Sequence, residues 1–315
     1  MRVLAVLPGP ALHGVVQHGR AVARLVRGAG ADVIIERSLT VSRTPADLTH
    51  VQFTDALFGP HAHAAAAAYE RWAGCVPGPV MVTLHDLPLA GADDERAARR
   101  RAAYRRVVRA SDAVMVSSPH EADELTGYSP HVIPLPLVPL GPLGPSPAWA
   151  DRPTVGVLGF IYPGKGHAAV VEAVPPGQRV VAAGGPSPGH ADLVEELHRR
   201  AQARGVDLVV TGAMGADDLH AAVLAVTVPV AAYSTSGSSA TLSTWLAAGR
   251  RPLTAPTAYT PGVLARWPDS LDLTQDLRTD IAAALAAPAR SWLPAPLRSP
   301  DVGRLHLAAY RSCLP

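Results

Sequence analysis

The sequence predicts an α/β protein with two parallel-sheet domains, and three observations carry this prediction. Short apolar segments alternate with segments of helical periodicity along most of the chain, as in a parallel sheet with helices on both faces. A proline-rich stretch from Pro134 to Pro153 interrupts this alternation near the midpoint, after which the alternation starts again. The length of 315 residues is typical of two domains of ordinary size.

The first half contains the elements of an N-terminal domain, which we expect to cover residues 1–137. We expect strands at 2–7, 32–36, 48–53, 80–84 and 113–117. Helices are expected at 15–28, 62–72, 92–110 and 120–126, where apolar residues recur with a helical period or alanine is abundant.

The second half repeats this organisation after a linker that we expect at residues 138–153. We expect strands at 154–158, 179–183, 207–210, 228–232 and 251–255. Helices are expected at 167–174, 191–203, 216–224 and 240–248. This C-terminal domain is predicted to cover residues 154–300, and a terminal helical segment covers residues 301–315.

Composition excludes several function classes. The formal net charge is +2, which gives no reason to expect a nucleic acid as partner. Cys75 and Cys313, the two cysteines, lie far apart without metal-ligand spacing, so we expect free thiols in a reducing, cytoplasmic compartment. The sequence contains no apolar run long enough to span a membrane, and residues 3–7 are better interpreted as a first buried strand than as a signal peptide.

One predicted helix is unusually rich in arginine, between Arg96 and Arg109. The simpler interpretation is a solvated helix face, with alanine and valine residues toward the core. A functional alternative is peripheral contact with an anionic membrane surface.

The turn between the strand at 154–158 and the helix at 167–174 carries the strongest functional signal. It contains Lys165 between Gly164 and Gly166. Backbone N–H groups of such a turn, the positive end of the following helix and the lysine ammonium all favour an anion such as a diphosphate. A surface lysine in an ordinary turn is the alternative.

A second polar turn, at residues 233–241, follows the strand at 228–232 and opens the next helix. It contains Gly237, which permits close backbone approach, and hydroxyl groups that suit a diphosphate, at Ser238, Ser239 and Thr241. Helix capping alone is the alternative, since serine and threonine are common N-cap residues.

In the first half, polar residues follow two predicted strands. His85 and Asp86 come directly after the strand at 80–84, and Asp55 follows the strand at 48–53. Because carboxyl ends of parallel strands meet at one edge of a sheet, these side chains are candidates for a site there. His85 is a candidate catalytic residue or a structural histidine, and Asp55 and Asp86 are candidates for binding an acceptor.

Six segments, taken in order, resemble GT-B glycosyltransferases of the family 4 kind. They are Ala46–Val51, Val82–Asp86, Ser111–Ser118, His131–Pro134, Gly159–Gly166 and Thr244–Gly249. The resemblance covers almost the full chain and implies two Rossmann-like domains facing across a cleft. It further implies transfer of a sugar from a nucleotide-sugar with retention at the anomeric carbon. In that family the loop that corresponds to residues 8–14 approaches the donor phosphates or the acceptor, which makes Gly14 the first candidate here and Gly9 the second. The terminal helix of that family packs back at the domain junction.

The sequence also departs from that family. Most members have two glutamates separated by seven residues, and Ser236 and Thr244 stand at those positions here. A hydroxyl group can still bond a ribose, although without the strength of a charged carboxylate. Phe160 replaces the arginine that binds phosphate in the family.

The resemblance therefore implies a metal-independent, retaining glycosyltransferase without a cofactor, acting on a nucleotide-sugar and a small-molecule or glycan acceptor. Its expected catalytic residues are His85 and Lys165. The expected donor-binding residues are Gly14, Lys165, Ser236, Gly237, Ser238, Ser239, Thr241 and Thr244. Two alternatives stay open: an inactive relative that binds a nucleotide-sugar or a partner, and a transferase for another activated sugar such as phosphoribosyl diphosphate.

Overall fold

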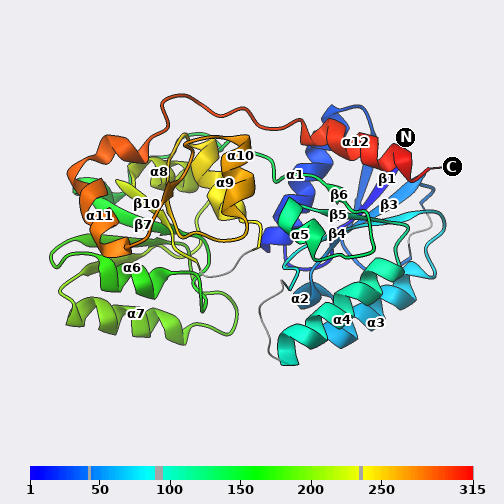
Figure 1. Ribbon diagram of the computed structural model, residues 1–315, viewed down its shortest axis with the longest axis horizontal. Coiled ribbons are helices and arrows are strands. Elements are labelled where there is room, and N and C mark those ends of the chain that lie inside the picture. The colour runs from blue at the N-terminus through cyan, green and yellow to red at the C-terminus, as the bar shows by residue number, and fades with distance from the viewer. Residues whose placement is uncertain (42–43, 89–94, 234–236, 315) are drawn as a thin grey trace. The chain divides into compact units, whose positions relative to one another are not determined.

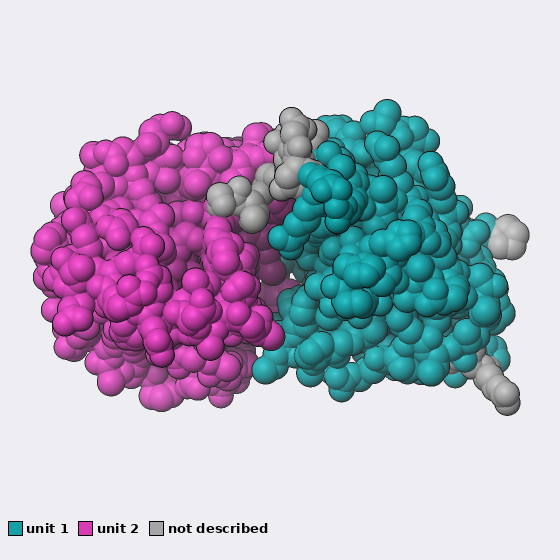
Figure 2. All heavy atoms as spheres, turned by 90° about the horizontal axis from the view of Figure 1, so that it is seen from below, with its two compact units in different colours: residues 1–136, 299–315 teal, residues 137–298 magenta. Residues whose placement is uncertain are grey.

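The computed structural model describes residues 1–41, 44–88, 95–233 and 237–314, and it divides into two compact units. The first unit consists of Met1–Pro136 together with Ser299–Pro315, and the second consists of Leu137–Arg298 (Figure 2). Each unit contains one six-stranded sheet with helices on both faces. The predicted α/β class with two parallel sheets is therefore confirmed.

The first sheet is parallel throughout, with the strand order β2-β1-β3-β4-β5-β6. Its strands are β1 (Arg2–Val6), β2 (Asp32–Glu36), β3 (Leu48–Phe53), β4 (Val80–Leu84), β5 (Ala113–Val116) and β6 (His131–Val132). The order of the strands reverses between β1 and β3. Ligands of open parallel sheets bind at such a reversal, beyond the carboxyl ends of the strands.

Two pairs of helices cover this sheet (Figure 1). The helices of the first unit are α1 (Gly14–Gly28), α2 (Asp55–Phe58), α3 (Ala62–Ala73), α4 (Glu95–Arg109), α5 (Pro119–Asp123) and α12 (Val302–Ser312). On one face, α3 and α4 pack around an aromatic cluster that includes Phe53, Tyr69 and Tyr104. On the other face, α1 and α12 pack over β1, β3 and β4.

The terminal helix α12 belongs to the first unit, although it follows the second unit in sequence. It packs on α1 at close range, because a Cβ atom on Gly303 would lie 2.4 Å from the carbonyl oxygen of Leu25. Glycine at this position lets the two helix backbones approach each other.

The second sheet is also parallel, with the order β12-β11-β10-β7-β8-β9. Its strands are β7 (Thr154–Leu158), β8 (Arg179–Ala183), β9 (Asp207–Val210), β10 (Val228–Ala231), β11 (Leu253–Thr254) and β12 (Asp272–Leu273). The order reverses between β7 and β10, which places the switch point of this sheet at the two loops that follow those strands.

The helices of the second unit lie on both faces of its sheet (Figure 1). They are α6 (His167–Ala173), α7 (Asp192–Ala203), α8 (Ala216–Ala225), α9 (Ala240–Ala247), α10 (Thr260–Arg266) and α11 (Leu277–Ala286), with 3-10 turns η1 (Ala148–Asp151) and η2 (Pro288–Ser291). Helices α6, α7 and α11 share one core with the sheet, and α8 and α9 cover the opposite face.

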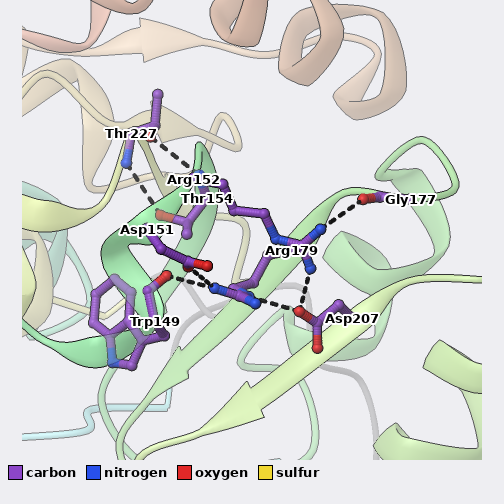
Figure 3. A network of polar contacts seen from close by, with 8 residues as sticks. All are labelled: Trp149, Asp151, Arg152, Thr154, Gly177, Arg179, Asp207 and Thr227. Atoms are coloured by element: carbon purple, nitrogen blue, oxygen red, sulfur yellow. Dashed lines mark hydrogen bonds and ion pairs between the residues drawn. The ribbon is translucent and has the colours of Figure 1, made fainter.

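The proline-rich stretch differs from the linker expected at residues 138–153, because it packs on the second unit (Figure 3). Arg179, at the start of β8, donates hydrogen bonds to the carbonyl oxygen of Trp149 at 2.7 Å and to Asp207 at 2.6 Å, and it pairs with Asp151. Further along, His220 bonds the carbonyl oxygen of Gly141 at 2.7 Å. The second unit therefore begins at Leu137 and not at residue 154.

The arginine-rich helix α4 divides its arginines between two environments. Arg100 and Arg106 are partly buried and form ion pairs with Asp55 and Glu70. Arg96, Arg105 and Arg109 lie on the exposed face. No helix in the described part of the chain combines the length and apolar character that crossing a membrane requires.

Candidate functional site

The two loops at the switch point of the second sheet carry the residues of the predicted phosphate site. The loop after β7 contains Lys165, and the loop after β10 leads into the serine-rich start of α9. Lys165 Nζ donates a hydrogen bond of 3.0 Å to Oγ1 of Thr241, in the first turn of α9. The structure thus brings together two segments that lie 76 residues apart in the sequence.

Glycines shape the lysine-bearing turn. Gly159, Gly164 and Gly166 have φ angles of +103°, +86° and +98°, which favour glycine. A Cβ atom on Gly166 would lie 2.5 Å from the carbonyl oxygen of Ala232 after β10. The turn can therefore follow the β10 backbone closely, which sets Lys165 beside Thr241.

Lys165 is the only lysine in the chain, against 27 arginines. Its side chain is buried, at 6% exposure, and its ammonium lies 5.2 Å from the ring centre of Tyr233 and 5.9 Å from that of Tyr162. Burial lowers the pKa of this ammonium to about 8. No carboxylate of the described residues pairs with it.

The serine-rich segment serves partly as a helix cap. Ser239 is the N-cap of α9, and its Oγ accepts a hydrogen bond of 3.2 Å from the N–H of Leu242. Gly237 and Ser238 precede this cap, whereas Ser236 lies outside the described residues. The Thr244 hydroxyl, one turn into the helix, donates to the carbonyl oxygen of Ala240 at 3.0 Å. Capping therefore accounts for Ser239 but leaves Gly237 without a capping role.

His167 is a residue of this site that the sequence analysis did not single out. It is the first residue of α6 and is buried, at 4% exposure. Neither ring nitrogen has a hydrogen-bond partner within the described ranges. Burial, together with the charge of Lys165, lowers the pKa of His167 to about 4. The sequence signal that could have identified His167 is its position directly after Lys165 and Gly166.

In the first unit, the residues after β3 and β4 form a second polar cluster. Asp86 has a φ angle of +53°, which is uncommon for a residue other than glycine and is typical of functional sites. Its carboxylate accepts a hydrogen bond of 2.9 Å from the Thr54 hydroxyl, and its carbonyl oxygen accepts one of 2.9 Å from Arg100.

Asp55 and Arg100 form a two-point ion pair in this cluster. Arg100 Nε lies 2.9 Å from Oδ2 of Asp55, and Nη2 lies 3.0 Å from Oδ1. Both side chains are mostly buried. The structure thus brings Asp55 and Asp86 together, as predicted for one sheet edge, and Arg100 already neutralises the Asp55 carboxylate.

His85 lies beside these residues at the end of β4. Its Nε2 is 2.7 Å from Oε1 of Gln52, and its carbonyl oxygen accepts a hydrogen bond of 2.7 Å from Tyr104. Burial lowers the pKa of His85 to about 4; Asp86 opposes this shift and His13 adds to it. The imidazole is therefore neutral at physiological pH.

Gly14 is the exposed first residue of α1. A Cβ atom there would meet nothing within 4 Å, so local packing does not require glycine. Gly9, in the same loop, has a φ angle of +106°, and a Cβ atom would lie 2.6 Å from the Leu57 side chain. Of the two, Gly9 is the one whose backbone and surroundings require glycine.

Comparison with known proteins identifies the fold. No protein-family model matches the sequence, and no curated protein matches it either. Solved structures do match: HepE from Anabaena, in complex with UDP-glucose, has a TM-score of 0.70 at 13% identity, with 99% of this chain and 100% of that chain covered.

Two further structures agree with this match. Sucrose-phosphate synthase from Thermosynechococcus elongatus has a TM-score of 0.62 at 15% identity, covering 100% of this chain and 95% of that chain. AviGT4, a glycosyltransferase involved in avilamycin A biosynthesis, has a TM-score of 0.56 at 16% identity, with 98% of this chain and 97% of that chain covered. The chain therefore has the GT-B fold that the sequence resemblance predicted.

Proposed function

We propose that the chain is a glycosyltransferase that moves a sugar from a nucleotide-sugar to a hydroxyl group of an acceptor. We further propose that the reaction retains the anomeric configuration and needs no metal ion. The fold supports this proposal, because HepE, with the same fold, was solved in complex with UDP-glucose. The arrangement of polar groups at the switch point of the second sheet supports it independently.

The single observation that carries the proposal is the buried ammonium of Lys165. An ammonium at 6% exposure whose hydrogen-bond partner among the described residues is a neutral hydroxyl is costly in the free protein. A bound anion would offset this cost. The N-terminus of α9 and the glycine-rich turn after β7 add N–H groups that favour a negative charge at the same place.

In this proposal, Lys165 and Thr241 bind the diphosphate of the donor. Transfer of the sugar leaves a nucleoside diphosphate, and negative charge grows on the oxygen that departs from the sugar. A fixed ammonium beside that oxygen stabilises the transition state more than the ground state. Gly237 and Ser238 are proposed to contribute backbone and hydroxyl contacts to the same diphosphate.

The first unit is proposed to supply the groups that bind the hydroxyl substrate. Asp86, with its exposed carboxylate and left-handed backbone, is the residue we expect to accept a hydrogen bond from an acceptor hydroxyl. Neutral His85 is proposed to accept a second one. Asp55, which is paired with Arg100, is proposed to hold this cluster in place.

A second candidate function is binding of a nucleotide-sugar without transfer. Two observations favour it over ordinary transfer: the Thr244 hydroxyl donates to its own helix, and Phe160 is 42% exposed where the related family has a phosphate-binding arginine. Binding and turnover therefore have to be measured separately.

The test uses the full chain and calorimetric titration with UDP, GDP, dTDP and UDP-glucose. We expect Lys165→Met to weaken binding of the preferred nucleotide diphosphate roughly 10- to 100-fold, the effect of losing a charge-assisted hydrogen bond. Arg199→Met, on the exposed face of α7, is the matched control and should leave binding unchanged. Equal affinity of Lys165→Met and the unchanged protein would contradict the proposal.

Transfer itself is measured by release of nucleoside diphosphate from the donor that binds, with and without EDTA. Retention is read from the anomeric configuration of the product by NMR. A donor that binds through Lys165 but is never turned over would favour the binding protein, and loss of turnover in EDTA would contradict metal independence.

A further inference from the structure

A continuous row of polar side chains crosses the interior of the first unit and ends at His85. Tyr310 Oη lies 2.7 Å from Nδ1 of His50, and Thr83 Oγ1 lies 2.7 Å from Nε2 of His50. Gln52 Nε2 is 3.2 Å from the same Nε2, and Gln52 Oε1 is 2.7 Å from Nε2 of His85. The first four residues are between 1% and 4% exposed.

Strand geometry places these side chains on one face of the sheet. His50 and Gln52 are two residues apart in β3, and Thr83 and His85 are two residues apart along β4 and its end, so each pair shares a face. Gln52 is paired with Thr83 in the β3–β4 register. This face is the one that α1 and α12 cover, and Tyr310 comes from α12.

The amide of Gln52 distinguishes its two histidine neighbours. Its oxygen can only accept a hydrogen bond, so Nε2 of His85 has to carry a proton. Its nitrogen can only donate, so the 3.2 Å contact is a hydrogen bond only when Nε2 of His50 is unprotonated; the His50 proton then lies on Nδ1, which donates to Tyr310. One amide thus imposes opposite tautomers on two neutral histidines.

Packing restrains the side chain of Gln52 near its base. A Cβ atom on Gly19 of α1 would lie 2.9 Å from Cγ of Gln52 and 2.2 Å from the Leu7 side chain. The α1 backbone therefore rests directly on Gln52. The His18 ring, also from α1, meets the His85 ring edge-on at 5.2 Å. These contacts restrain Cγ of Gln52 and the ring of His85, and the hydrogen bonds of the amide set the orientation of its terminal atoms.

The consequence for His85 is a lone pair on Nδ1. No residue in the described parts of the chain hydrogen-bonds to this nitrogen, whereas Nε2 is engaged by Gln52. His85 is only partly buried and follows the carboxyl end of β4, beside Asp86. Burying so many polar groups in an α/β core is costly unless all of them are satisfied, and a satisfied network fixes one arrangement.

We propose that Gln52 is a positioning residue whose amide holds His85 as the Nε2–H tautomer, so that Nδ1 accepts a hydrogen bond from a substrate hydroxyl. The hydroxyl belongs to the acceptor or to the transferred sugar. The identity of this substrate rests on the proposed function. The tautomers of His50 and His85, and their dependence on Gln52, do not rest on it.

The direct test is nitrogen NMR of the full chain labelled at its histidines, recorded near pH 7.5. We expect His85 as the Nε2–H form and His50 as the Nδ1–H form, with the signals assigned from the variants His85→Asn and His50→Asn. The reversed pair, with His85 protonated on Nδ1, would overturn the proposal. So would a His85 that exchanges between both forms.

Gln52→Glu separates positioning from mere structural support. A carboxylate beside Nε2 favours the imidazolium form, so the pKa of His85 rises and Nδ1 becomes protonated at a higher pH than in the unchanged protein. Other titratable and charged groups near His85 stay in place: His13, His18, His50, Asp86, Arg100 and Tyr104. We expect the acid limb of the pH–rate profile to move up by roughly one unit or more.

Gln202→Glu, the same change on the exposed face of α7, is the control and should leave the profile unchanged. Gln52→Met, which removes both hydrogen bonds at similar volume, should lower the transfer rate about 10- to 100-fold at every pH. A Gln52→Glu rate that falls by one factor at all pH values would indicate a structural role only. If no donor is turned over, the proposed function fails, while the NMR result still decides the role of Gln52.

Discussion

At the residue scale, Lys165 differs from the 27 arginines of the chain in the shape of its cationic group. Both side chains carry a positive charge, but the guanidinium is broad and planar, whereas the ammonium is a compact point charge. The space around Lys165 is narrow: Thr241 lies on one side, two tyrosine rings lie within 6 Å, and a Cβ atom on Gly159 would already be 3.4 Å from Cε. These near neighbours suit the compact ammonium.

Because Lys165 is unique, its protonation can be followed directly. Reductive methylation with ¹³C-labelled formaldehyde labels this one side chain besides the N-terminus. We expect the pKa of Lys165 at about 8 in the free protein. A bound nucleoside diphosphate should raise that pKa, because the anion favours the charged ammonium, so the protein takes up a proton on binding near pH 8.

The proton uptake is checked by calorimetry at pH 8 in buffers of different ionisation enthalpy. A Lys165 pKa near the ordinary value of 10.5, or one that does not change when UDP saturates the protein, would contradict this prediction. Titration of the α-amino group in the same sample provides an internal reference.

Individual residues also show what a sequence can predict. Lys165 was predicted because its flanking glycines and its position between a strand and a helix are visible in the sequence. The role of Gln52 was not predicted, because His50 and Gln52 look like ordinary polar residues of a half-buried strand. The contacts of these two side chains depend on which helix covers that face of the sheet and on the register between β3 and β4. Ser236 stays a prediction.

At the scale of elements, five of the six described strands of each sheet were predicted, since a strand that is buried on both faces is a short apolar run, whereas the two-residue strands β6 and β12 were not predicted. The candidate site residues follow β7 and β10 in one sheet and β3 and β4 in the other, at or next to the point where the strand order reverses. The proline-rich stretch was not predicted correctly. Proline composition indicates a lack of helix and strand, but it does not show that Arg179 and His220 hold the stretch on the second unit.

Arg179 is therefore expected to control the order of this stretch without affecting ligand binding. Its guanidinium, 15% exposed, joins the carbonyl oxygen of Trp149 and the carboxylates of Asp151 and Asp207 (Figure 3). We expect Arg179→Ala to lower the free energy of unfolding by about 1–2 kcal/mol, as for a partly buried ion pair with further hydrogen bonds. Hydrogen exchange in residues 141–153 should become faster.

Arg199→Ala provides the control, since its pair with Glu196 is exposed and should contribute little. Nucleotide affinity should stay within about twofold in both variants, because Arg179 starts β8 whereas Lys165 follows the opposite end of the sheet. Unchanged exchange in 141–153 after Arg179→Ala would show that packing of the prolines alone holds the stretch.

At the scale of the whole molecule, the two units share a plan but differ in their buried ionisable groups. In the described part of the chain, the first unit contains five histidines whose pKa is lowered mainly by burial, namely His13, His18, His50, His85 and His306. The second unit contains one, His167. The network around His50 that orients His85 thus also makes the first unit sensitive to acid.

The sign of this sensitivity follows from linkage. In the unfolded chain a histidine titrates near 6.5, whereas in the folded unit His85 and His306 titrate at about 4. Between these pH values the unfolded chain binds protons that the folded chain does not. The contribution of the neutral histidines to the free energy of unfolding is therefore fully present above about pH 7 and decreases as the pH is lowered. For a fully buried histidine the loss at pH 5 is roughly 2 kcal/mol.

We therefore expect the first unit to lose stability before the second when the pH is lowered from 7 to 5. Hydrogen exchange followed by mass spectrometry resolves the two units, because each peptide belongs to one of them. Protection in β3, β4 and α12 should fall over this range, while β7 and β10 change less. Ion pairs with arginine hold the pKa of carboxylates such as Glu70 and Asp207 below this pH range. Their protonation therefore does not contribute to the difference in protection between the two units. Equal loss of protection in both units, or no loss by pH 5, would contradict this prediction.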